Sequence, residues 1–344
     1  MSPASAPDCG YPEFLPPTTE SMQFEHLIAD VKEDLAQVEK TILSHLGTEI
    51  PLLNDVAKHI LLSGGKRLRP AVLILSARMF GGMGGPVYHA AASLEFLHTA
   101  TLLHDDVVDG SDLRRQRRTA RVVWGNAASV LVGDYLLAIA FRSLTLLKNL
   151  TVLDTISDTT SLMAKGEILQ LIRRYDTASE ADYLAIIIYK TASLFAAAAK
   201  IGACFGGAEE EEQRQLYQYG HELGIAFQIV DDALDYVQER DKVGKPLGTD
   251  FKERKVTLPL SRLLSVLEGR EREDLLARLG QDEIGDDDVL HVVRLMQRED
   301  VLPYTLNEAR KYVERAKSRL EGLPGGAEKQ KLSRLADFVV DREF

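Results

Sequence analysis

Cysteine is scarce in this sequence, and so are the patterns that would build a disulfide or metal framework. Among the 344 residues only Cys9 and Cys204 are cysteine, and they lie far apart without the spacing of metal ligands. We therefore expect neither a disulfide framework nor a zinc site. Such low cysteine usage is typical of a reducing compartment, and we expect a cytoplasmic protein.

Basic charge and long apolar runs are also lacking. The formal net charge is -11, which argues against general nucleic-acid binding because such proteins need a basic surface. No apolar run approaches the roughly 18 residues of a membrane span, so we expect no transmembrane segment. The N-terminus has no basic start followed by an apolar stretch, and we expect no secretory signal.

Strand-like alternation of apolar and polar residues is absent, apart from an ambiguous run from Ala185 to Tyr189 with helix-compatible flanks. Apolar residues instead recur at helical spacing, from Leu27 to Ile42 and again from Leu306 to Leu320. This pattern predicts an all-α fold in which many helices pack around a core, as one domain over residues 21–344. Residues 1–20 are rich in proline, and we expect a flexible tail there.

Three carboxylates end one apolar helical run, in the segment Asp105-Asp106-Val107-Val108-Asp109. On a helix with about 3.6 residues per turn, Asp105 and Asp109 lie only about 40° apart around the axis. Like charges this close repel one another, so they need either water or a hard cation among them. A solvated helix face and a metal site both remain open for this cluster alone.

Basic residues flank this helix on both sides. Before it, the glycine turn Gly64-Gly65 leads into Lys66, Arg67 and Arg69, next to the start of another helix, where anions bind well. His98 lies about two turns before Asp105 on nearly the same face. After it, arginines crowd into a short segment at positions Arg114, Arg115, Arg117, Arg118 and Arg121. Arginine forks match phosphate oxygens. The alternatives are a basic surface loop, a structural histidine and surface ion pairs.

The second half of the chain repeats the arrangement. Asp231, Asp232 and Asp235 again follow an apolar helical run, and a basic loop containing Lys245 and Lys255 follows them. Two such clusters, each with a basic loop, are far less expected by chance than one. Together they predict a site for a metal-bridged polyphosphate, in which carboxylates hold cations and basic side chains hold oxygens.

Five segments together closely resemble the trans-polyprenyl diphosphate synthases. They are Gly64–Pro70, Asp105–Asp109, Lys190-Thr191, Phe227–Asp235 and Gly244-Lys245. The resemblance covers roughly residues 24–344. The run from His98 to Asp134 is most similar to octaprenyl and other long-chain synthases. The resemblance implies an isoprenoid-synthase bundle of helices around a deep central cavity.

The resemblance also implies the reaction, a head-to-tail 1'-4 condensation of isopentenyl diphosphate with an allylic diphosphate. Mg²⁺, about three ions per active site, would bridge the aspartates and the allylic diphosphate and neutralise the charge on the departing group. No protein nucleophile is needed. The implied metal ligands are Asp105, Asp109, Asp231 and Asp235, and the other catalytic residues are Asp106, Asp232 and Lys190.

By the same resemblance, two sets of side chains would hold the two substrates. The allylic diphosphate would contact Arg114, Lys190, Thr191, Gln228, Lys245 and Lys255. Isopentenyl diphosphate would contact Lys66, Arg69, His98 and Arg115. Gln116 departs from the family, which usually has glycine after the paired arginines. This change alters the turn but removes no charged contact.

Product length should depend on the space below the first aspartate cluster. Short-chain members commonly carry aromatic residues four or five positions before the first aspartate, where this chain has the small residues Thr101 and Ala100. Helical geometry places Thr101 beneath Asp105, whereas the pocket role of Ala100 rests on the resemblance. Small residues here favour a long product of about C40–C50.

The resemblance further implies a homodimer, for which apolar helices such as Leu131 to Phe141 could supply the interface. It suggests a product for quinone side chains, released with transient membrane contact. The alternatives are a shorter-chain farnesyl or geranylgeranyl diphosphate synthase, a non-catalytic subunit and a terpene cyclase. A non-catalytic subunit would tolerate loss of the aspartates or of the Lys66 loop, yet all are present. A cyclase needs no second anion site, and a di-iron bundle would need Glu-x-x-His pairs that are missing.

Overall fold

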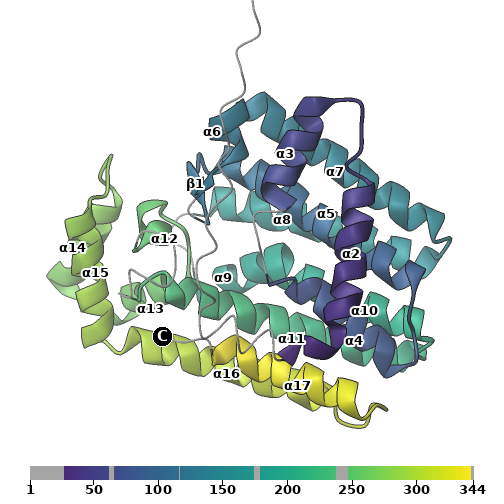
Figure 1. Ribbon diagram of the computed structural model, residues 1–344. Helices are drawn as coiled ribbons and strands as arrows, with labels where there is room; N and C mark the ends of the chain where they lie inside the picture. The colour runs from purple at the N-terminus through teal and green to yellow at the C-terminus, as the bar shows by residue number, and fades with distance from the viewer. Residues whose placement is uncertain (1–26, 62–65, 116, 174–178, 238–246, 342–344) are drawn as a thin grey trace, which may run out of the picture.

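The computed structural model describes residues 27–61, 66–115, 117–173, 179–237 and 247–341 (Figure 1). The proposed tail, residues 1–20, lies outside the described residues. The elements in chain order are η1 (Ala29–Val31), α2 (Lys32–Ser44), α3 (Pro51–Leu61), α4 (Leu68–Met79), α5 (Gly85–Val108), β1 (Leu113–Arg114), β2 (Arg117–Arg118), α6 (Ala120–Trp124), α7 (Asn126–Leu146), α8 (Leu150–Ile172), α9 (Glu180–Ile187), η2 (Ile188–Ala192), α10 (Ser193–Gly206), α11 (Glu210–Leu234), α12 (Thr249–Lys252), α13 (Leu258–Val266), α14 (Gly269–Leu279), α15 (Asp286–Arg298), α16 (Val301–Arg319) and α17 (Ala327–Val340).

The predicted all-α fold is confirmed, with one small exception. Within the described residues the only strands are β1 and β2, two residues each, which pair antiparallel with Leu113 opposite Arg118. This hairpin is too short for an alternation pattern to reveal. The ambiguous run from Ala185 to Tyr189 is helical, in α9 and the π-helical segment η2.

Helices α5 and α11 are the long central helices, with 24 and 25 residues. Helix α5 begins with Pro86 in its first turn, where the missing N–H costs nothing. Helix α11 begins with Glu210, Glu211 and Glu212, whose charges favour the positive end of the helix dipole. The C-terminal ends of both helices carry the aspartate clusters.

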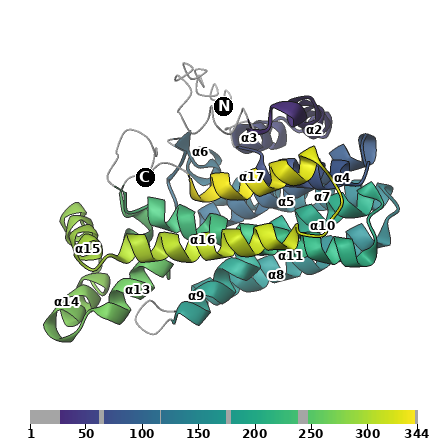
Figure 2. The ribbon, with the colours of Figure 1, turned by 90° about the horizontal axis from the view of Figure 1, so that it is seen from below.

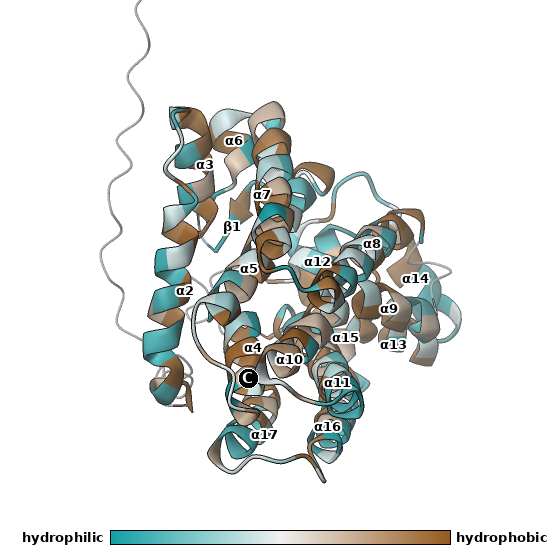
Figure 3. Cartoon of the chain, turned by 90° about the vertical axis from the view of Figure 1, so that its right-hand side faces the viewer, coloured by the Kyte–Doolittle hydropathy of each residue, from teal (hydrophilic) through white to brown (hydrophobic). Residues whose placement is uncertain are grey.

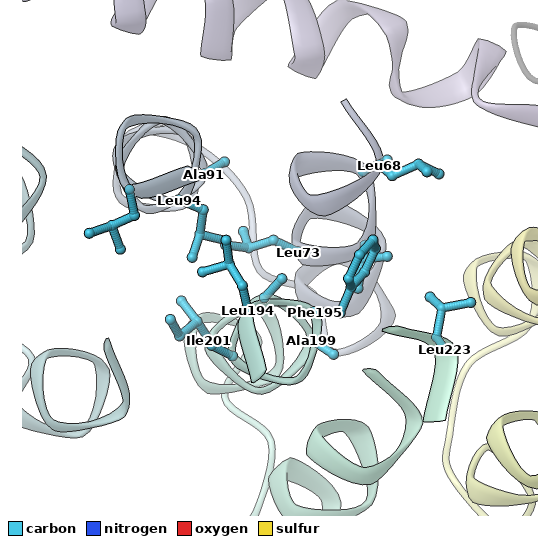
Figure 4. Packing of buried hydrophobic residues seen from close by; sticks show 14 of the residues in the cluster. Leu68, Leu73, Ala91, Leu94, Leu194, Phe195, Ala199, Ile201 and Leu223 are labelled. Atoms are coloured by element: carbon cyan, nitrogen blue, oxygen red, sulfur yellow. The ribbon is translucent and has the colours of Figure 1, made fainter. Parts of the chain in front are cut away.

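The main core lies between α4, α5, α10 and α11, where apolar side chains from all four helices meet (Figure 4). Small residues let these helices approach closely. A Cβ on Gly202 of α10 would lie 2.2 Å from the carbonyl oxygen of Leu73 in α4, and one on Gly220 of α11 would lie 2.3 Å from that of Phe195 in α10. The tight packing fixes α11 relative to the helices that carry the other site residues.

A second, smaller core joins α13, α14, α15 and the start of α16, with Tyr236 and Phe251 buried in it. Helices α14 and α15 lie at one end of the molecule, beyond α13 (Figures 1 and 2). Helix α16 spans both cores, with Val301 in the smaller one and Ala309 and Val313 in the main one. The smaller core thereby holds the segment after α11 against the bundle.

Within the described residues, two helical segments are long and apolar enough to cross a membrane by length and composition alone, although neither contains a long uninterrupted apolar run. They are Asn126–Leu146 and Glu180–Gly206, with 39% and 67% of the most apolar window buried. The second packs inside the bundle. Figure 3 shows the hydropathy of each residue along α7, α9 and α10, the helices that make up these two segments. Such core helices pass the same test as membrane spans, so the finding is weak evidence for a membrane segment.

Candidate active site

The first aspartate of the first cluster faces a lysine from the middle of the chain. Asp105 Oδ2 lies 3.8 Å from Lys190 Nζ. Lys190 also contacts Glu167 Oε2 at 2.5 Å and Gln170 Oε1 at 3.3 Å, both on α8. Burial raises the pKa of Asp105 to about 6, and the charge of Lys190 opposes that rise. The structure therefore brings these two predicted site residues together and adds Glu167 and Gln170 beside them.

The other two aspartates of this cluster also face cations. Asp106 is 1% exposed, and its Oδ1 accepts hydrogen bonds from Arg114 Nε at 2.9 Å and Nη2 at 2.8 Å. Asp109 Oδ2 lies 3.0 Å from Lys255 Nζ. Lys255 follows α12, so this ion pair joins the two halves of the chain across the site. The nearby Asp109 charge helps to raise the pKa of Lys255.

The second cluster has a different environment. Asp231 is exposed, whereas Asp232 is 5% exposed and accepts hydrogen bonds from Tyr183 Oη at 2.8 Å and Gln228 Nε2 at 2.7 Å. Asp235 Oδ2 accepts the backbone N–H of Asp250 at 2.8 Å. The hydrogen-bond donors to Asp232 are neutral side chains, whereas the charge of Asp231 acts on Arg69 and Arg115.

Basic side chains gather beside His98, as predicted. Burial lowers the pKa of His98 well below its usual value, and repulsion from Arg69, Arg115 and Arg114 lowers it further. His98 is therefore neutral and can donate one ring N–H. The crowding of positive charge around an uncharged imidazole is an arrangement that an anion would stabilise.

Arg69 and Lys66 have aromatic neighbours. The Arg69 guanidinium lies 4.6 Å from the Phe195 ring centroid, and Lys66 Nζ lies 5.3 Å from that of Phe338. Burial lowers the pKa of Arg69 to about 10, while Glu95 and Asp231 raise it. The effect of Asp231 on Arg69 shows that the second aspartate cluster and the predicted isopentenyl diphosphate residues share one electrostatic environment.

Arg67 pairs with a buried carboxylate. It has a left-handed backbone conformation, with φ 48°, and its guanidinium pairs with the buried Glu95 and donates to the carbonyl oxygen of Leu61 at 2.7 Å. The guanidinium of Arg67 is therefore engaged by protein groups, although its charge still acts on His98. Lys245 and Gln116 lie outside the described residues.

Four residues that contact the site were not functional candidates in the sequence analysis, one of them Gln170, which contacts Lys190. Glu167 binds Lys190, Tyr183 binds Asp232, and Asp250 holds Asp235 through its backbone N–H. Glu167 lies between the two clusters in the sequence, but no spacing rule connects it to Lys190. In the sequence, Tyr183 cannot be distinguished from other tyrosines of the core, because its contact with Asp232 forms only when α9 packs on α11.

The carboxylates fit a hard divalent cation that shares its coordination with a ligand. Among the described residues, no group of three or more His, Cys, Asp or Glu side chains surrounds a single point. Mg²⁺ rarely uses an all-protein cage and is usually held by one or two carboxylates together with phosphate oxygens. The carboxylates of Asp105, Asp109 and Asp231 would supply that kind of partial set.

Comparisons with known proteins agree on one family. The polyprenyl synthetase family matches residues 50–296. The chain is 40% identical over 313 residues to the octaprenyl diphosphate synthase of Haemophilus influenzae, covering 90% of this chain and 94% of that protein.

Solved structures give the same result. A decaprenyl diphosphate synthase from Rhodobacter capsulatus is 40% identical with a TM-score of 0.87, covering 93% of this chain and 99% of that one. A polyprenyl synthase from Caulobacter crescentus, solved with calcium and isoprenyl diphosphate, is 39% identical with a TM-score of 0.89, covering 93% and 98%. The chain therefore belongs to the polyprenyl synthetase family.

Proposed function

We propose that the protein is a long-chain trans-polyprenyl diphosphate synthase, a prenyltransferase that adds isopentenyl diphosphate units head-to-tail to an allylic diphosphate. The observation that carries the proposal is the pair of aspartate clusters at the ends of α5 and α11, together with the ion pair between Asp109 of the first cluster and Lys255 from the second half of the chain. The similarity to octaprenyl and decaprenyl synthases supports a product of about C40–C50. A cytoplasmic enzyme that supplies quinone side chains is consistent with this product.

The allylic diphosphate would bind between the two clusters. Lys190 and Lys255 would donate to its oxygens, together with Arg114, Thr191 and Gln228. Bound Mg²⁺, about three ions held by Asp105, Asp109, Asp231 and Asp235, would neutralise the charge that develops on the departing diphosphate. The lysines add to this effect because each can exchange a carboxylate partner for a diphosphate oxygen.

Isopentenyl diphosphate would bind on the basic side. Lys66, Arg69 and Arg115 supply positive charge, and neutral His98 supplies a hydrogen-bond donor. Arg69 is held in place by stacking on Phe195, so its guanidinium needs little reorganisation when the anion arrives. Two anion sites of different construction support a two-substrate condensation rather than a cyclisation.

Space along α5 would set the product length. Thr101 lies one turn before Asp105 and is partly exposed, and its Oγ1 donates to the carbonyl oxygen of His98 at 2.8 Å. Ala100 is 2% exposed and lies further round the helix. We expect Phe in place of Thr101, or Ala100→Phe, to shorten the product. Chromatography that shows an unchanged chain length for both would contradict the pocket assignment.

We also propose a homodimer. Large apolar side chains are exposed on α7 and at the start of α8, where Leu131, Leu146 and Leu150 are 66%, 71% and 81% exposed. A second copy of the chain would remove them from water, which favours association. Release of a long prenyl product would then involve transient contact of the enzyme with a membrane.

The direct test is product analysis with the purified chain. It is incubated with labelled isopentenyl diphosphate and farnesyl diphosphate, with Mg²⁺ or with a chelator. A ladder of linear diphosphates ending near C40–C50 only with Mg²⁺ is the expected result. A shorter end point would indicate a short-chain synthase, and a cyclic hydrocarbon would indicate a cyclase. No incorporation by the chain alone would contradict the proposal and favour a non-catalytic subunit.

A further inference from the structure

A chain of hydrogen bonds connects a buried tyrosine to the site. Tyr183 Oη donates to Asp232 Oδ2 at 2.8 Å, Gln228 Nε2 donates to Asp232 Oδ1 at 2.7 Å, and Thr191 Oγ1 donates to Gln228 Oε1 at 2.8 Å. The chain runs from α9 through α11 to η2. Its inner end is closed to water, because Tyr183 is 0% exposed and Asp232 is 5% exposed.

This chain fixes which end of the Gln228 amide faces Asp232. The amide nitrogen faces Asp232 Oδ1, and the amide oxygen accepts from the Thr191 hydroxyl. A flipped amide would withdraw the N–H that Asp232 accepts. One of the two amide N–H groups is used by Asp232, and the other is the donor that Gln228 can offer to a ligand.

Tyr183 in turn determines the position of Asp232. Its hydroxyl binds the second carboxylate oxygen, so each oxygen of Asp232 has one donor and the side chain is held from both sides. Lys190 and Lys255 are cations that an entering diphosphate would attract away from their carboxylates. The phenol is uncharged and buried, so the diphosphate has no comparable pull on it.

We propose that Tyr183 is a positioning residue for the allylic diphosphate, acting through Asp232 on the amide of Gln228. The proposal rests on the proposed function of the site. Tyr183 does not touch the substrate. It keeps the Gln228 donor and the neighbouring Thr191 in the orientation that the diphosphate needs, while the lysines change partners.

A matched control separates positioning from simple burial. Tyr219 is also 0% exposed, and its hydroxyl donates to the carbonyl oxygen of Leu332 at 2.7 Å. Tyr219→Phe therefore removes one buried hydrogen bond of the same kind, but away from the aspartate clusters. Both Tyr→Phe variants should lower the melting temperature by a similar amount.

The test measures substrate binding in Tyr183→Phe and Tyr219→Phe. The readouts are KM for farnesyl diphosphate, KM for isopentenyl diphosphate, and calorimetric binding of farnesyl thiodiphosphate, an unreactive analogue with sulfur in the bridging position. For Tyr183→Phe we expect farnesyl KM to rise and analogue affinity to fall by about ten-fold, as for loss of one oriented hydrogen bond. The KM for isopentenyl diphosphate should change by less than about two-fold, as should the farnesyl KM of Tyr219→Phe.

Two further variants keep the proposal testable. In a Gln228→Met background, Tyr183→Phe should have no additional effect on the farnesyl KM, because the residue through which it acts is gone. If Tyr183→Phe does not fold, Asp232→Asn replaces it, since an asparagine amide allows Gln228 to flip and should give the same selective loss.

The outcomes separate this proposal from the proposed function. An unchanged farnesyl KM and analogue affinity in Tyr183→Phe, with a stability loss like that of Tyr219→Phe, would overturn the positioning role and leave the enzyme assignment intact. A wild-type protein that binds the analogue without turnover would still allow the positioning role to be measured. A wild-type protein that neither binds nor reacts would overturn both.

Discussion

The two aspartate clusters have the same spacing but different partners. At the end of α5, Lys190, Arg114 and Lys255 each bring positive charge to one aspartate. At the end of α11, Asp232 is held by neutral side chains and Asp235 by a backbone N–H, while Asp231 is exposed. Each aspartate of the first cluster therefore has a cation close by, whereas the hydrogen bonds to Asp232 come from neutral side chains.

The position of each cluster on its helix explains why its partners matter. Both lie at helix C-termini, where the helix dipole disfavours negative charge. A carboxylate there needs compensation, which the first cluster takes from Lys190, Arg114 and Lys255 and which Asp232 takes from the Tyr183 and Gln228 donors. We infer that the first cluster reorganises when substrate binds, and the second acts as the fixed wall of the site.

The largest expected effect comes from the first cluster. Asp105→Asn keeps the shape of the side chain but removes the charge opposite Lys190, so kcat should fall by about 10³-fold, as for loss of a preorganised charge at a reacting group. The comparison is Asp235→Asn, which still accepts the Asp250 N–H and should lose about ten-fold. Steady-state kinetics of both variants checks this order, and an equal loss would contradict the division between the clusters.

Loss of the ion pair between Lys255 and Asp109 should have the next largest effect. Lys255→Met removes the cation at Asp109, and turnover should fall by about 10²-fold because a diphosphate contact is lost. Lys252→Met is the matched control, since Lys252 lies only three residues before Lys255 and pairs with the exposed Asp286 at 2.7 Å. Such surface pairs contribute little, so its kinetics should be unchanged. A similar loss in both variants would contradict the assignment of Lys255.

The pH dependence of stability should report on Asp105. Its pKa is raised from 3.8 to about 6 in the folded protein, so the folded state binds the proton more tightly than the unfolded state. The resulting stability is fully present below the unfolded pKa and is lost as the pH rises through the folded pKa. Relative to Asp105→Asn, the metal-free wild type should lose about 2 kcal/mol of unfolding free energy between pH 4 and 7. Urea unfolding in chelator measures this, and a pH-independent difference would contradict the buried charge.

The smallest expected effect tests how Lys190 is placed. A Cβ at Gly166 of α8 would lie 2.8 Å from the backbone nitrogen of Lys190 and 2.9 Å from Tyr189 Cβ. Gly166→Ala should therefore displace η2 and lower turnover by about ten-fold, since small misplacement of a positioned group is costly. Gly47→Ala is the control, because nothing lies within 4 Å of a Cβ there. Unchanged turnover in Gly166→Ala would show that Lys190 tolerates the shift.

Much of this site follows from the sequence, because helical periodicity and motif spacing are local. The spacing predicts that Asp105 and Asp109 share a face, and both do meet basic side chains. The resemblance supplied Lys190, Thr191, Gln228 and Lys255, and the structure brings Lys190 to Asp105 and Lys255 to Asp109. The metal-ligand and substrate roles of these residues remain predictions.

The rest depends on contacts between distant segments. Nothing in the sequence distinguishes Arg67, which pairs with buried Glu95, from Arg69, which lies beside His98. Nor does it pair Tyr183 with Asp232 or Glu167 with Lys190, since these contacts exist only after α8, α9 and α11 pack. The two DDxxD segments look alike in the sequence because their difference lies entirely in their neighbours.

We infer that metal and diphosphate each complete the binding site of the other between the two clusters. Titration of the wild-type protein with Mn²⁺, followed by electron paramagnetic resonance, tests it directly when done with and without farnesyl thiodiphosphate. We predict weak Mn²⁺ binding alone, because Lys190 and Lys255 occupy the first cluster, and binding at least about 100-fold tighter with the analogue, where phosphate oxygens complete the coordination. Equally tight Mn²⁺ binding without the analogue would contradict the account.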